Sequence, residues 1–170
     1  PKIPGLFLLT APARPHGRPV TEIQMADLLR EVRRRFDFCL LDAPAGLGRG
    51  FQLATCAADR CVVVTTADAS SLRDAQHTVM ELDRFPAGAL HLVVNRERKK
   101  LLRQLHATID DAIDKAGLPL LGVVPEDDAL PLCMNRGVPI LLADGQSAAT
   151  AYRNIAKRLQ GERVPLLRIR

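Results

Sequence analysis

The chain has 170 residues, of which 47% are hydrophobic and 25% are charged. This is the size and composition of one ordinary globular domain, which excludes a disordered or low-complexity protein. The formal net charge of +5 permits contact with nucleic acid or anionic lipid without requiring it. The four cysteines form no CxxC pair and the four histidines lack ligand spacing, so we expect a reducing cytosol, no metal site built on Cys or His and no His-based catalytic site.

Short, nearly continuous apolar runs predict a series of β-strands. Runs of this kind are typical of parallel strands that are covered on both faces. The predicted strands are Leu6–Thr10, Phe38–Asp42, Cys61–Thr66, Leu90–Asn95 and Leu120–Val124.

Stretches with helical periodicity separate these runs. The first begins at a capping box formed by Thr21 and Gln24 and carries an apolar stripe that ends at Phe36. The remaining helices are predicted from Ser70 or Ser71 to before Pro86, from Leu102 to Gly117, briefly after Asp128 with Pro131 in the first turn, and from Ala148 to Gly161. The alternation of strands and helices predicts an α/β fold with a mostly parallel sheet and helices on both faces.

Ligands of open α/β sheets bind beyond the carboxyl ends of the strands, so the residues that follow each strand are the candidates for a site. Asp42 ends an apolar strand and precedes a glycine-rich turn, 46–50. This arrangement is how a Walker B aspartate reaches Mg²⁺, usually through water. The alternative is an aspartate that merely caps a helix.

Two further strands end in residues that could contact a base. Asn95 and Arg96 follow one strand, and an Asn amide can pair with an adenine edge. Pro125, Glu126 and Asp127 follow the next strand. Each loop alone could be an ordinary cap. Jointly they lead us to expect that the loops beginning at Asp42, Asn95 and Pro125 converge on one rim around a purine nucleotide.

Several segments resemble the MinD/ParA family of ATPases with a deviant Walker A loop, and most of all its septum-site-determining MinD members. The similarity covers nearly the whole chain. It is carried by Phe36–Phe51, Val62–Thr66 with Ser71–Ala75, Asn95–Arg96, Leu118–Asp127, Asn135–Pro139 and Ala151–Leu159.

The resemblance implies a P-loop NTPase fold and ATP hydrolysis, with ATP and Mg²⁺ as cofactors. It implies that Asp42 is the catalytic switch II aspartate acting on Mg²⁺, and that Gly46 lies near the γ-phosphate. It implies an adenine side made of Asn95 and Arg96, with Pro125, Glu126 and Asp127 lining the base.

The resemblance also implies partners. These are a second copy of the chain in the ATP state, a MinC-like and possibly a MinE-like division regulator, and an anionic membrane surface, with Arg73 and Asp74 near the dimer and partner surface. The implied location is the cytoplasm and the inner face of the cell membrane. Two alternatives stay open: a ParA-type positioning ATPase that binds DNA, and a nucleotide-free scaffold.

The sequence departs from the family in lacking the Lys-Gly-Gly-x-Gly-Lys-Thr phosphate loop and the strand that precedes it. We therefore expect residues 1–161 to be the C-terminal portion of a MinD-like ATPase domain that, by itself, binds ATP weakly or not at all and is inactive. Residues 162–170 form a basic and apolar tail, which either contacts a membrane or is solvated.

Overall fold

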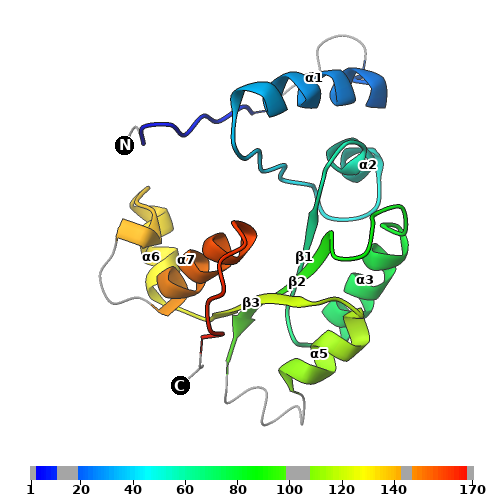
Figure 1. Ribbon diagram of the computed structural model, residues 1–170. Helices are drawn as coiled ribbons and strands as arrows, with labels where there is room; N and C mark the ends of the chain where they lie inside the picture. Colours follow the sequence, from blue (N-terminus) through cyan, green and yellow to red (C-terminus); the bar gives the residue numbers. More distant parts are fainter. Residues whose placement is uncertain (1–2, 11–18, 99–107, 143–146, 168–170) are drawn as a thin grey trace. The chain divides into compact units, whose positions relative to one another are not determined.

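A computed structural model describes residues 3–10, 19–98, 108–142 and 147–167 of the chain (Figure 1). The chain divides into two compact units, Pro1–Ala58 and Asp59–Arg170. In the described ranges no helix combines the length and the apolarity needed to cross a bilayer.

The first unit contains helix α1, Glu22–Arg35, which begins at the predicted capping box. The amide of Gln24 donates to Oγ1 of Thr21 at 3.2 Å, and the amide of Thr21 donates to Oε1 of Gln24 at 3.0 Å. Three arginines occupy the last turn, where positive charge favours the helix dipole. The helix ends at Phe36, whose backbone is extended. The start predicted from the sequence is confirmed.

Helix α2, Arg49–Thr55, follows the glycine-rich turn and was not predicted from the sequence. Arg49 anchors it by donating to the carbonyl oxygen of Val20 at 2.6 Å. A Cβ at Gly50 would lie 2.5 Å from Cγ of Pro44, so only glycine fits beside this proline without a shift. Gly50, which the sequence placed in a glycine-rich turn, therefore lies in α2 and packs against Pro44.

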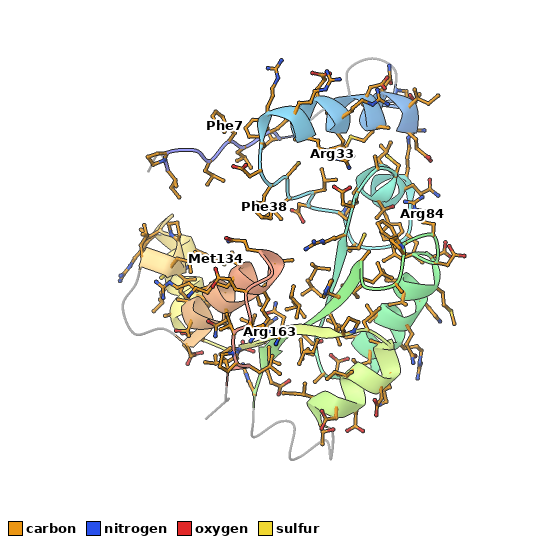
Figure 2. The ribbon with its side chains drawn as sticks, viewed as in Figure 1. Phe7, Arg33, Phe38, Arg84, Met134 and Arg163 are labelled. Atoms are coloured by element: carbon orange, nitrogen blue, oxygen red, sulfur yellow. The ribbon has the colours of Figure 1, made fainter. Side chains whose placement is uncertain are left out.

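Two predicted strands, Leu6–Thr10 and Phe38–Asp42, are not strands in the structure. Both segments lack ladder pairing within the described part of the chain, and their apolar side chains are exposed, with Leu8 at 88% and Leu40 at 86%. Phe38 lies in the connection between α1 and α2 (Figure 2). An apolar run becomes a strand only where a neighbour satisfies its backbone N–H and C=O groups, and the run itself does not provide that neighbour.

The second unit is built on a parallel sheet whose described strands are β1, Cys61–Thr65, β2, Leu90–Glu97, and β3, Leu120–Pro125, in that order. Helices α3, Ala69–Met80, and α5, Ile109–Ala116, lie on one face of the sheet, and α7, Ser147–Leu159, lies on the other (Figure 1). The parallel α/β fold is confirmed.

The ends of these helices refine the predictions. The N-cap of helix α3 is Asp68, whose side chain accepts from the amide of Ser71, and not the predicted Ser70 or Ser71. Helix α5 is capped at its start by Thr108 and at its end by Gly117, whose φ of 65° is left-handed as expected of a helix-ending glycine. The earlier part of the predicted third helix, with Leu102, lies outside the described residues.

The sheet is covered unevenly. In β2, Leu92 and Val94 are fully buried, and Val93 between them belongs to a core cluster with Ala148 of α7. In β1, Val63 is buried, whereas Val62 and Val64 are 37% and 60% exposed. The prediction that all strands are covered on both faces is thus wrong for β1, which is an edge strand of the sheet that the described residues form.

The chain after β3 forms helix α6, Ala129–Asn135, a 3-10 turn, η1, Ile140–Leu142, and α7. Pro131 lies in the first turn of α6 as predicted, but the side chain of Asp128 makes no capping hydrogen bond. Helix α7 packs closely on β3, since a Cβ at Gly122 would lie 2.4 Å from Cγ1 of Ile155.

Candidate functional site

The neighbouring carboxyl ends of β2 and β3 bring two of the predicted loops together. Val94 pairs with Val123 and Glu97 pairs with Pro125, so three steps along β2 face two steps along β3. The extra residue is a bulge at Asn95 and Arg96. Bulges of this kind bend a strand and redirect its side chains.

The bulge gives Arg96 an unusual backbone, with a φ of 55°. The left-handed region is uncommon for residues other than glycine and persists where the surrounding structure holds it. Its guanidinium reaches across to the next strand end, where Nη2 lies 3.2 Å from Oε1 of Glu126. The amide of Glu126 also donates to the carbonyl oxygen of Glu97 at 2.9 Å, so the two strand ends are joined by both backbone and side chains.

Arg98 is a second partner of Glu126, with Nη2 also 3.2 Å from Oε1. Hydrogen bonds from Arg96 and Arg98 lower the pKa of Glu126 below its ordinary value. Arg98 was not among the site residues predicted from the sequence. No local signal identified it, because the bulge at Asn95 and Arg96 interrupts the alternation of side chains along β2 and only folding brings Arg98 to Glu126.

Glu97 lies between the two arginines and is 3% exposed. Burial raises the pKa of its carboxyl group, and a hydrogen bond from the backbone of Arg98 opposes this in part. A buried carboxyl group beneath the bulge is costly unless its surroundings are polar. The burial of Glu97, which directly follows the predicted adenine-side residues, was not anticipated from the sequence.

Asn95 and Pro125 differ in how far they are buried. Pro125 is buried at the end of β3, whereas Asn95 is half-buried at the bulge. No hydrogen bond joins the side-chain amide of Asn95 to another residue in the described part of the chain. Such an amide can both donate to and accept from a bound group.

Asp127, which the resemblance implies lines the base, has a carboxylate that is engaged within the protein. Its carboxylate accepts hydrogen bonds from the amides of Ala129 and Ala148, each at 3.1 Å. Partial burial raises the pKa of Asp127, but the hydrogen bonds from Ala148, Ala129 and Ser147 outweigh it, and the net pKa is below the ordinary value. The carboxylate therefore stays ionised where two helices begin.

Asp42 and Gly46 lie in the first unit, and both are exposed. Gly46 has a φ of 85°, and a Cβ there would meet no atom within 4 Å, so this turn needs glycine for its backbone and not for lack of space. Among the described residues no group of three or more His, Cys, Asp or Glu could hold a metal ion. The convergence of Asp42 with Asn95 and Pro125 stays a prediction.

Residues 14–159 match the protein family described as Cellulose biosynthesis protein BcsQ. The chain belongs to this family. It is also 32% identical over 169 residues to the septum site-determining protein MinD of Synechocystis sp., covering 98% of this chain and 63% of that protein. The resemblance to MinD that the sequence indicated is confirmed.

Solved MinD structures share the fold. The MinC:MinD cell division protein complex of Aquifex aeolicus matches with a TM-score of 0.82 and 29% identity, over 88% of this chain and 63% of that one. The septum site-determining protein MinD of Pyrococcus horikoshii, complexed with Mg-ADP, matches with a TM-score of 0.69 and 25% identity, over 82% of this chain and 56% of that one. The chain thus spans less than two thirds of the length of these relatives.

Proposed function

We propose that the chain supplies the switch II segment and the adenine side of a MinD-like ATPase that acts in division-site selection. The observation that carries this proposal is the bulged end of β2, where Arg96 pairs with Glu126 and leaves the amide of Asn95 available beside the end of β3. The protein family that residues 14–159 match is named for cellulose biosynthesis. A relative that is 32% identical over 98% of the chain is a septum site-determining protein, and this similarity favours the division role.

The residues present fit a nucleotide on the base side. The amide of Asn95 offers one donor and one acceptor to an adenine edge. Pro125 and the backbone of the following loop form the other side of the site, and Glu126 is held in place by two arginines. In this proposal Asp42 holds Mg²⁺ through water, and Gly46 allows a phosphate to approach the backbone. Bound Mg²⁺ would neutralise charge on the phosphate oxygens.

The partners follow from the same family. A MinC protein is present in the Aquifex aeolicus MinD structure, so we propose a MinC-like division regulator as a partner here. A homodimer in the ATP state, a MinE-like regulator and a peripheral position on the inner face of the cell membrane belong to the proposal as well. The exposed side chains of the segment that begins at residue 162, among them Arg163 and Leu166, would supply the contact with anionic lipid.

The test uses the full-length gene product with Mg-ATP. We expect Asp42→Ala to abolish ATP hydrolysis and Asn95→Ala to weaken nucleotide binding, with circular dichroism and thermal unfolding unchanged in both. His77→Ala, at an exposed position of α3, is the matched control and keeps full activity. Undiminished turnover in the Asp42 variant would refute its assignment.

A membrane experiment separates the division role from a ParA-like role. The MinD-like protein should sediment with anionic liposomes in the presence of Mg-ATP. Binding to DNA that falls steeply with salt, without a response to anionic lipid, would instead indicate a positioning ATPase that uses the net charge of +5 for DNA.

A further inference from the structure

The carboxylate of Asp127 is engaged by the first residues of two helices. Oδ1 accepts from the amide of Ala129, in α6, at 3.1 Å. Oδ2 accepts from the amide of Ala148, in α7, at 3.1 Å, and from the hydroxyl of Ser147 at 3.3 Å. One side chain therefore fixes the end of β3 to elements that begin two and twenty residues further along the chain.

The contact with α7 lies inside the protein. Ala148 and Ala149 are both 0% exposed, so water cannot replace a lost partner of the Ala148 amide. The first amides of a helix have no partner within the helix and need one from elsewhere. If Asp127 turned toward a base, it would leave this buried amide unsatisfied, which is costly.

Asp127 is also the second of two restraints on the same loop. Glu126 is held from the β2 side by Arg96 and Arg98, and its backbone amide donates to Glu97. Asp127 holds the loop from the helix side. Two consecutive residues thus fix the short loop between β3 and α6. Glu126 is bound to residues at the end of β2, and Asp127 is bound to the first residues of α6 and α7.

We propose that Asp127 is a positioning residue, which keeps Pro125 and Glu126 in place by pinning the end of β3 to the first turns of α6 and α7 and does not itself contact the nucleotide. This inference rests on the proposed function, since it assigns a role within the same base-side site. It gives another role to a side chain that the family resemblance implied would line the base.

The first arm of the test needs no nucleotide. Amide hydrogen exchange is measured in the full-length protein without nucleotide and in its Asp127→Ala, Asp127→Asn and Asp128→Ala variants. We expect the amides of Ala129 and Ala148 to exchange about tenfold faster in Asp127→Ala, because a lost cap weakens the helix start. Asn keeps an acceptor oxygen and should restore most of the protection. Asp128, the adjacent acid, makes no capping hydrogen bond, so its variant is the control.

The second arm measures the affinity of the full-length protein for Mg-ATP and Mg-GTP. A positioning role predicts that Asp127→Ala weakens both by the same factor, about tenfold, and that Asp127→Asn restores both. A changed ratio between the two nucleotides would mean that the carboxylate reads the base and would overturn the proposal. So would faster exchange with unchanged affinity, because Asp127 would then stabilise the helices alone.

The two arms separate this inference from the proposed function. If the unsubstituted full-length protein binds neither nucleotide, the proposed function fails. The positioning role at a nucleotide site then fails with it, while the exchange arm still decides whether Asp127 holds the two helices. If the protein binds Mg-ATP but Asp127→Ala exchanges like the parent, the inference fails and the proposed function stands.

Discussion

The guanidinium of Arg158, in α7, donates to the carbonyl oxygen of Leu121, in β3, at 2.7 Å. The same group donates to the carbonyl oxygens of Val164, at 2.8 and 3.1 Å, and of Pro165, at 2.7 Å. Leu167 packs against the core cluster beneath α7. A single arginine therefore joins the segment after α7 to the strand at the edge of the sheet.

Arg158→Ala should release this segment. Hydrogen bonds to a charged group contribute about 1.5–3 kcal/mol each, and because water replaces part of them here we expect a loss of about 2 kcal/mol in the free energy of unfolding. Trypsin should cleave after Arg163 faster than in the parent chain. Lys157→Ala, a change at an exposed basic neighbour, is the control and should leave both measurements unchanged. Equal cleavage rates in the parent and the Arg158 variant would contradict the assignment.

Gly122→Ala should destabilise the second unit. The added Cβ would lie 2.4 Å from Cγ1 of Ile155 and 2.9 Å from its Cδ1, so α7 must shift away from β3. Overpacking of this kind costs about 1–3 kcal/mol, measured by urea unfolding. Adding Ile155→Ala should make the double variant more stable than the sum of the single effects predicts. Gly48→Ala is the control, because a Cβ there meets no atom within 4 Å. Additive effects at Gly122 and Ile155 would show that the predicted clash is absent.

Asp68 should make stability depend on pH in the acid range. Hydrogen bonds from the amide of Ser71 and from the hydroxyls of Thr66 and Ser71 lower the pKa of Asp68 from 3.8 to about 2. Because the folded pKa is the lower one, the stabilisation is complete above the ordinary pKa and is lost as the pH falls toward the folded pKa of about 2. The difference in unfolding free energy between the parent and Asp68→Asn should shrink over this range. Parallel curves for the two proteins would rule out this role.

The pair of arginines on Glu126 should act together. Removing Arg98 alone leaves Arg96 at 3.2 Å from the carboxylate, so the pKa of Glu126 should rise only part of the way to its ordinary 4.5. The double variant Arg96→Ala, Arg98→Ala should bring it to the ordinary value. Carbon NMR of the Glu126 carboxyl measures this titration, and Arg73→Ala, on the exposed face of α3, is the control. An unchanged titration in the double variant would mean that neither arginine holds Glu126 in solution.

Local features were predictable from the sequence because their signals lie within a few residues. The capping box of Thr21 and Gln24 spans one helical turn, and the glycine that ends α5 follows its last residue directly. The apolar runs of β1, β2 and β3 were also recognised, and the quoted segments were sufficient to indicate the family. Composition and periodicity report such features because the interactions that create them are short-range.

The sequence alone determined the family, the parallel α/β pattern and the start of α1. The tertiary structure decided which apolar runs became strands, since Phe38–Asp42 has the composition of a strand and no ladder partner among the described residues. It also decided that Arg98 joins Glu126 and that Asp127 serves two helices, one of which begins twenty residues away. The physical reason is distance along the chain: a ladder, an ion pair or a shared cap joins residues that only folding brings together, and no local pattern encodes the partner.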